Sequence, residues 1–131
     1  ESLRFQKNHF ASLEMTLVFK QILTQQTMII YNVTINIDES VHEQWLNWMQ
    51  TKHIKEMLNT GCFKSARLVK VLVDEDMGGV TYSVQYFAEN QAALDDYKNN
   101  HAPLLRSEGL QLFADKMLTF RTDLEIISEH E

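Results

Sequence analysis

Residues 28–37, Met-Ile-Ile-Tyr-Asn-Val-Thr-Ile-Asn-Ile, are the stretch that decides the fold of this chain. Every second position from Ile29 to Ile37 carries a large apolar side chain, and most positions between them carry Asn or Thr. Alternation with a period of two, rich in β-branched residues, predicts a strand with one buried face. The rest of the fold is worked out from this strand.

A helix and a hairpin are predicted after this strand. Ser40-Val41-His42-Glu43 has the Ser-x-x-Glu form of a capping box, and Gly61 is suited to end the helix that follows. Residues 66–73 and 80–87 are predicted strands, joined by the acidic, glycine-containing turn at 74–79. Two such strands around a short turn are typical of a β-hairpin.

A second helical region and a last strand complete the pattern. Asn90 is a good N-cap, and Pro103 is expected to open a new helical segment, since proline deep in a helix removes a hydrogen bond. Residues 118–127 are the last predicted strand. The order β-α-β-β-α-β predicts an α+β, ferredoxin-like fold with a four-stranded antiparallel sheet and two helices on one face. In the second helical region we expect these positions to be buried: Leu94, Tyr97, Leu104, Leu105, Phe113 and Met117.

The N-terminal segment differs from the rest of the chain. Residues 1–27 start with Glu and show only a weak helical stripe at Phe10, Leu13 and Leu17. One interpretation is that Met28 is the natural start and that 1–27 are an extension. The other is a genuine N-terminal helix that docks on the domain. We therefore expect a single ferredoxin-like domain over residues 28–131, preceded by this N-terminal extension.

The alternation of each strand predicts which side chains share a face of the sheet. The face covered by helices is expected to carry Ile29, Tyr31, Val33, Ile35, Val80, Tyr82, Val84, Leu118, Phe120 and Leu124. The opposite, open face is expected to carry Ile30, Asn32, Thr34, Asn36, Thr81, Ser83, Gln85, Phe87, Thr119, Arg121, Asp123 and Glu125. This polar set suits a bare face in water, or a partly wet interface or polar chamber between two sheets. Because Asn and Ser are poor strand formers, we expect a homodimer formed through this face, in the manner of a dimeric α/β barrel.

Composition excludes several classes of protein. The chain has 131 residues, a formal net charge of −6 and an isoelectric point near 5.3, which argues against nucleic acid and anionic membrane surfaces as partners. Apolar runs are too short for a transmembrane helix. The single cysteine, Cys62, cannot form an internal disulfide. We therefore expect a cytoplasmic protein.

Several separated motifs resemble one protein family. They are Met28-Ile-Ile-Tyr-Asn-Val-Thr, Trp45-x-x-Trp48-Met49, His53-Ile54, Thr60-Gly61-x-Phe63, Tyr82-x-x-Gln85-Tyr86-Phe87, His101-Ala102-Pro103, Leu105-Arg106 and Phe120-Arg121-Thr122-x-Leu124-Glu125. Together they are similar to the uncharacterised bacterial family called domain of unknown function 4286, over about residues 28–129. The resemblance implies a dimeric α/β-barrel relative of the ferredoxin-like fold and no established activity.

Other dimeric α/β barrels resemble the chain at the level of fold. They include small oxygenases of the antibiotic-biosynthesis type and haem-degrading enzymes. In the haem degraders a strand-one Asn, a Trp and a helix-two His form the site, and Asn32 and His101 are the positions here that resemble the first and the last. Both tryptophans, Trp45 and Trp48, lie instead in the first predicted helix. Fold analogy alone is a weak argument for function.

Two histidines are the candidates for proton chemistry near neutral pH. His53 and His101 are weak catalytic candidates, and each also has a structural interpretation, as a hydrogen-bonded helix residue or as a cap at the helix break. Ligand-binding candidates are Asn32, Trp48, Gln85 and Arg121, with Arg121 holding an anionic group. The spacing of His, Cys and acidic residues predicts no metal site, and no cofactor is expected. Cys62, at a helix C-terminus, is not expected to be an activated nucleophile.

Three functions from different classes remain open from the sequence. The first is a dimeric module that binds a small molecule or a protein partner. The second is a small oxygenase or isomerase that uses Asn32, His53, His101 and Arg121 around an apolar pocket. The third is a purely structural dimer. The first is favoured, and whether the chain is an enzyme stays open.

Overall fold

The computed structural model describes residues 15–16, 27–73, 76 and 78–131. Most of the predicted N-terminal extension, and part of the predicted turn at 74–79, lie outside these residues. Within them, four strands form one antiparallel sheet in the order β2-β3-β1-β4. The strands are β1 (Ile29–Ile37), β2 (Ser65–Lys70), β3 (Val80–Ala88) and β4 (Met117–Glu125).

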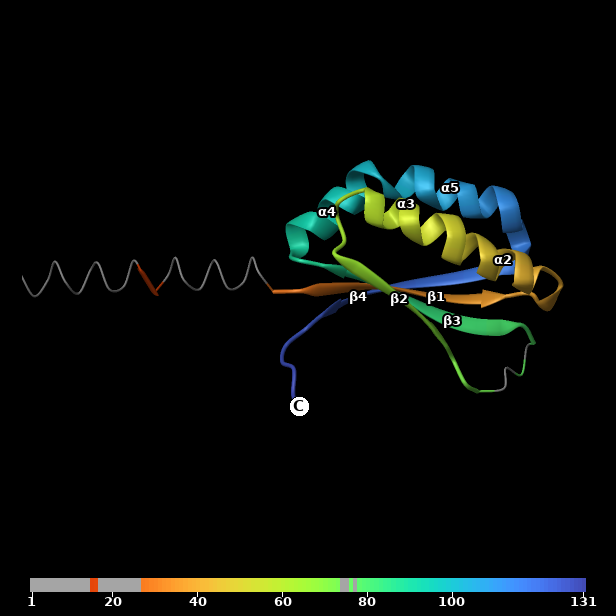
Figure 1. The fold of residues 1–131 in the computed structure, drawn as a ribbon, viewed down its shortest axis with the longest axis horizontal. Helices are drawn as coiled ribbons and strands as arrows, with labels where there is room; N and C mark the ends of the chain where they lie inside the picture. Colours follow the sequence, from red (N-terminus) through yellow and green to blue (C-terminus); the bar gives the residue numbers. More distant parts are fainter. Residues whose placement is uncertain (1–14, 17–26, 74–75, 77) are drawn as a thin grey trace, which may run out of the picture.

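Helices α2 to α5 lie on one side of this sheet, and no described element covers the other side (Figure 1). The sheet of one chain is therefore open and does not close into a barrel. The α+β, ferredoxin-like fold with the predicted β-α-β-β-α-β order is confirmed. Strand β1 is central, pairing with β3 and β4, and its side chains alternate between buried and half-buried as its sequence predicts.

The first helical region runs from His42 to Asn59 in three consecutive parts. They are α2 (His42–Trp48), a π-helical turn η2 (Met49–His53) and α3 (Ile54–Asn59). The predicted capping box does not form. Asp38 instead caps a preceding 3-10 turn, η1 (Glu39–Val41), by accepting hydrogen bonds from the backbone N–H and hydroxyl of Ser40. The acidic residue two positions earlier accepts these hydrogen bonds, so the N-terminus is shifted from the predicted cap.

The second helical region consists of α4 (Gln91–Asn100) and α5 (Ala102–Phe113), separated at His101. Asn90 caps α4 by accepting from the N–H of Ala93 at 2.9 Å, and Pro103 lies in the first turn of α5, both as predicted. Leu104 was expected to be buried but is 71% exposed. The buried stripe of α5 passes through Leu105 instead. The helix starts after the break at His101, and this start determines which of its side chains point toward the sheet.

The prediction for the two faces of β4 is wrong. Directly opposite residues of paired strands share a face, and β1 places Thr34 opposite Phe120 but Val33 opposite Arg121. Arg121 therefore lies on the helix-covered side. The apolar residues Leu118, Phe120 and Leu124 belong to the open face, where they are 51%, 71% and 41% exposed. For β1 and β3 the predicted faces are confirmed.

The core lies between the sheet and the helices and is rich in aromatic rings. Trp45, Tyr31, Tyr86 and Phe113 are almost fully buried there. Phe63 lies against Tyr31, Tyr86 and Tyr97 with ring centroids 5.0–6.1 Å apart, and such contacts add to the free energy of burial. Among the described residues, no helix is long and apolar enough to cross a membrane.

Candidate functional site

A small pocket lies between the helices and the covered face of the sheet. It is lined by residues from strands β1, β3 and β4 and from both helical regions. Its lining comprises Tyr31, Val33, Ile35, Trp45, Trp48, Met49, His53, Met57, Tyr86, Tyr97, Leu105, Arg106, Gly109, Met117, Thr119 and Arg121. The pocket is thus mostly aromatic and apolar, with a few polar groups that converge on it, as in many small-molecule sites.

The π-helical turn helps to shape this pocket. Such turns insert an extra residue into a helix and are frequent at functional sites. Thr51 donates its hydroxyl hydrogen to the carbonyl of Asn47 at 2.7 Å, a bond that bends helices. The turn contributes Met49 and His53 to the pocket wall.

His53 is held in the pocket as a neutral imidazole. Its ring stacks on Trp48, with centroids 4.4 Å apart and an interplanar angle of 21°. Burial lowers the pKa of His53 from 6.5 to about 4, against a smaller opposing effect of the nearby Glu56 carboxylate. The ring is therefore uncharged at neutral pH and can accept a proton or a hydrogen bond.

Polar atoms without a protein partner gather around this pocket. Among the described residues, the structure has five buried side-chain polar atoms that make no hydrogen bond. Four of them belong to pocket residues: Nε1 of Trp45 and of Trp48, Nδ1 of His53 and Nε of Arg106. Because buried polar atoms are normally paired, these four atoms are available to a water molecule or a ligand in the pocket.

The pocket is positively charged in an acidic protein. Its lining includes Arg106 and Arg121 but no Asp or Glu. Arg106 donates from a terminal N–H to the hydroxyl of Tyr31 at 2.9 Å. The three ion pairs found among the described residues all use lysine, so neither arginine is neutralised by a carboxylate there.

Two further tyrosines enclose the inner end of the pocket. Burial raises the pKa of Tyr86 and of Tyr97 well above the usual value of tyrosine. The positive charges of Arg106 and Arg121 oppose this effect at Tyr97 and only partly offset it. Both phenols therefore stay neutral at physiological pH.

The structure brings together only part of the predicted site. Trp48, His53 and Arg121 line the pocket. Asn32 and Gln85 lie on the open face, on the opposite side of the sheet. The predicted combination of Asn32 with His53 and Arg121 therefore does not form one site.

On the open face, Asn32 and Gln85 take part in a continuous hydrogen-bond network. Ser83 donates to Oδ1 of Asn32 at 2.5 Å, and Gln85 donates weakly to the hydroxyl of Ser83 at 3.5 Å. Arg67 donates twice to Oε1 of Gln85, at 3.2 and 2.9 Å. Asn32 also donates to Thr34 at 3.1 Å. These polar groups satisfy one another, unlike those of the pocket.

His101 lies apart from the pocket. It ends α4 and belongs to a different group of side chains, with Cys62 and Asp96. It does not line the cavity that holds His53. The two histidines, predicted to share a cleft, are therefore not in one site.

Sequence reasoning did not identify Arg106 as a site residue, although Leu105-Arg106 is among the motifs that resemble the family. This arginine lies in α5 beside the buried stripe of Ala102, Leu105 and Gly109. The available signal was a single arginine next to an apolar helical stripe. Such an arginine either extends its guanidinium into solvent or is held in the interior by a hydrogen-bond partner. Tyr31 and Tyr97 were expected only as core residues.

Comparisons with solved structures show the fold. An Arabidopsis thaliana hypothetical protein superposes with a TM-score of 0.60 at 12% identity, covering 82% of this chain and 96% of its own. A Bacteroides thetaiotaomicron protein of unknown function, described as a possible oxidoreductase, gives 0.58 at 11% identity, covering 77% and 99%. A dimeric ferredoxin-like protein from an uncultured marine organism gives 0.54 at 14% identity, covering 79% and 99%.

The sequence itself matches one protein family. The model of the family described as Domain of unknown function (DUF4286) matches residues 28–127. No curated protein matches the sequence. The family match covers the whole described sheet and every helix packed on it.

Proposed function

The chain belongs to the DUF4286 family, and from this premise we propose that it is a homodimeric binding protein whose covered pocket takes a small aromatic carboxylate. The observation that carries the proposal is the set of four unpartnered polar atoms around the pocket. Three of them are N–H groups, on Trp45, Trp48 and Arg106. A ligand with hydrogen-bond acceptors would satisfy them.

Charge and shape narrow the class of ligand. Two arginines without a carboxylate in the lining favour an anion, and a guanidinium binds a carboxylate through two parallel hydrogen bonds. The aromatic and methionine walls favour a ring. The cavity volume of the pocket is about 50 Å³, so the pocket admits a ligand with at most one ring. Met49, Met57 and Met117 can change rotamer to admit it.

Titration calorimetry with benzoate, and with benzyl alcohol as a neutral analogue, tests this proposal. We expect benzoate to bind with a stoichiometry of one per chain and benzyl alcohol to bind far more weakly. Replacing Arg106→Met keeps an apolar side chain but removes the guanidinium. The affinity for benzoate should fall about ten- to a hundredfold, as expected for the loss of a hydrogen bond to a charged group.

The matched control is Arg67→Met. Arg67 lies on the open face and does not line the pocket, so this variant should bind benzoate as the parent chain does. Arg121→Met provides a second test if Arg106→Met is poorly folded, because Arg121 is exposed at the pocket's edge. Equal loss of affinity in Arg67→Met, or no binding of benzoate at all, would contradict the proposal and favour a structural dimer.

The open sheet face is proposed as the homodimer interface. Its most exposed apolar side chains lie on the two edge strands: Leu118, Phe120 and Leu124 on β4, and Val69, which is 37% exposed, on β2, whereas Ile30 and Phe87 on the central strands are half-buried. The polar network lies between them. Exposed apolar residues on both sides of a satisfied polar strip suit packing against a second copy. One protein with a similar fold is described as dimeric.

Light scattering coupled to size-exclusion chromatography tests the interface. Phe120→Glu places a charge in the proposed contact and should give monomers. Arg121→Glu, the neighbouring position on the other face, should leave the dimer intact. A dimeric Phe120→Glu variant, or a monomeric parent chain, would contradict this interface.

A catalytic use of the same pocket is the second candidate. The favouring observation is His53, an uncharged imidazole whose Nδ1 has no partner among the described residues. A ligand bound by the arginines would present a proton to this nitrogen. In this case His53→Gln should abolish turnover of a bound substrate while leaving its affinity within a fewfold. Equal turnover by the variant would exclude His53 as the base.

A further inference from the structure

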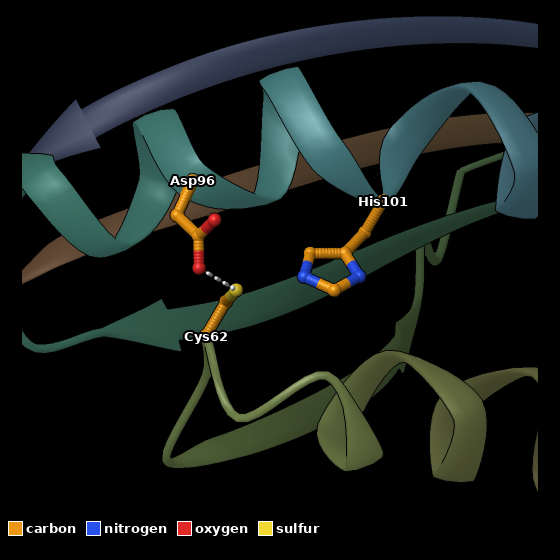
Figure 2. A group of neighbouring side chains, drawn as sticks. All are labelled: Cys62, Asp96 and His101. Carbon is orange, nitrogen blue, oxygen red and sulfur yellow. Dashed lines mark hydrogen bonds between the residues drawn. The ribbon is translucent and has the colours of Figure 1, made fainter.

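Three potential metal ligands meet outside the pocket, between the end of α4 and the segment that follows α3. Cys62 follows α3, Asp96 lies on α4, and His101 joins α4 to α5. Figure 2 shows the Asp96 carboxylate on one side of the Cys62 sulfur and a ring nitrogen of His101 facing it from the other. The sulfur lies 3.4 Å from Oδ2 of Asp96. One ligand atom from each residue lies within 4.8 Å of the other two.

These distances are near those of a tetrahedral zinc site. With Zn–S of about 2.3 Å and Zn–N or Zn–O of about 2.0–2.1 Å, neighbouring ligand atoms are about 3.3–3.6 Å apart. The sulfur and the carboxylate already have this separation. A small rotation of the His101 side chain closes the remaining gap, because this residue lies between two helices and is only half-buried.

The chemistry of the group does not suit a nucleophilic thiol. Burial, together with the hydrogen bond to Asp96 and its negative charge, raises the pKa of the Cys62 thiol. Without a cation the sulfur therefore keeps its proton and donates it to the carboxylate. A nucleophilic cysteine needs the opposite environment, with a positive group beside the sulfur.

We propose that Cys62, Asp96 and His101 bind a zinc-like divalent cation. The thiol releases its proton to solvent as the Sγ–metal bond forms, so that thiolate, carboxylate and imidazole surround the ion. The cation then lies between sulfur and carboxylate and offsets the repulsion between the thiolate and the carboxylate that loss of the thiol proton creates. A mixture of sulfur, nitrogen and oxygen ligands favours zinc over magnesium or calcium, which bind through oxygen.

The surroundings complete the site in two ways. Asn100 donates to Oδ1 of Asp96 at 2.6 Å, which leaves Oδ2 directed at the sulfur. Such outer contacts orient a ligand for its metal. A surface pocket lined in part by Asn59, Thr60 and His101 adjoins the group. Asp96 is exposed and His101 is half-buried, so water can supply a fourth ligand, as in zinc sites with three protein ligands.

This site departs from the sequence prediction of no metal. Cys62 and Asp96 are 34 positions apart, and only the fold brings them together. Asp96 and His101 are close in sequence, but they are not spaced for one helical face. Short-range metal motifs therefore give no signal here.

Titration of the metal-free full chain with Co²⁺, followed by competition with Zn²⁺, tests the proposal. We expect one Co²⁺ per chain, a sulfur-to-cobalt charge-transfer band in the near ultraviolet, and displacement of Co²⁺ by Zn²⁺. Cys62→Ser should abolish the band. Asp96→Asn and His101→Gln should each weaken binding at least tenfold, because even the loss of an outer contact costs 10–100-fold.

His130→Gln is the matched control, since His130 lies near the C-terminus and outside the group, and it should bind Co²⁺ as the parent chain does. Asp96 is exposed, so Asp96→Asn is expected to fold even where a change at the buried Cys62 does not. The proposal is overturned if the parent chain binds no stoichiometric Co²⁺, if the band is absent, or if Asp96→Asn and His101→Gln bind as tightly as the control.

Discussion

The two faces of the sheet treat polar groups in opposite ways. On the open face, a hydrogen-bond network joins the side chains of Asn32, Ser83, Gln85 and Arg67, so these polar groups are paired with one another. Between the covered face and the helices, a buried polar atom without a partner among the described residues belongs to each of Trp45, Trp48, His53 and Arg106. The face that looks polar in sequence is therefore the satisfied one, and the unsatisfied one lies beneath the helices.

This difference separates two tasks within a single small domain. A satisfied polar strip flanked by Phe120 and its apolar neighbours suits contact with another protein surface. Unpaired N–H groups in an aromatic pocket suit a ligand with acceptors, because leaving them unpaired costs free energy on folding. A ligand bound beneath the helices therefore supplies hydrogen bonds to polar groups that lack them, whereas the polar groups of the open face are already paired.

The largest difference between the faces should be in stability. Trp45 is 0% exposed, whereas Phe120 is 71% exposed. Trp45→Ala should lower the free energy of unfolding by about 3–5 kcal/mol. Phe120→Ala should lower it by far less when measured on the monomer. Urea denaturation of both variants measures the two losses, and similar values would show that the two faces do not differ in packing as described.

The next effect is a pH dependence that arises from His53 in the pocket. The pKa of His53 is about 4 in the folded chain against 6.5 as the ordinary value, so the unfolded chain binds more protons between these limits. The contribution of the neutral His53 ring to the free energy of unfolding is therefore fully present above pH 6.5. It is lost as the pH falls toward 4. The full loss is about 3 kcal/mol at most, at 1.36 kcal/mol per unit of pKa.

Unfolding measured at pH 7.0 and 4.5 for the parent chain and for His53→Gln checks this dependence. The variant should lose less stability between the two pH values than the parent chain does. His130→Gln is the control and should behave as the parent. If His53→Gln and the parent lose the same stability, then His53 is not buried as a neutral ring.

A smaller effect should separate stability from binding in the pocket itself. Gly109 lies in α5 and lines the pocket; a Cβ there would lie 3.3 Å from the flexible end of Met117 and 3.5 Å from Trp48. Gly109→Ala should therefore raise stability by up to about 1 kcal/mol through helix propensity, while its methyl group narrows the pocket and weakens benzoate binding. Thermal denaturation and calorimetry on one sample test both effects. Unchanged affinity would place the ligand elsewhere.

Much of the fold was predictable because local signals agreed with one another. The alternation in β1 gave its position and its buried face, Asn90 gave the start of α4, and Pro103 gave the start of α5. In each case the deciding contact is with residues a few positions away, or the pattern is strong enough to define a face alone.

The errors occurred where a face depends on a distant partner. The alternation in β4 shows which residues share a side but not which side meets the helices. Because β4 is an edge strand with its apolar residues on the open face, placing apolar residues inward assigned Phe120 and Arg121 to the wrong sides. Arg106 and the Cys62–Asp96 pair were not predictable for the same reason: their neighbours come from other elements.

The central claim, that ligand binding belongs to the covered face, is tested most directly by NMR. Benzoate is added to ¹⁵N-labelled protein, and the side-chain N–H signals of both faces are followed together. We predict saturable shifts of the two indole N–H signals, from Trp45 and Trp48, and of the Arg106 Nε–H. Shifts confined to the side-chain amides of Asn32 and Gln85, or no saturable shift at all, would contradict it.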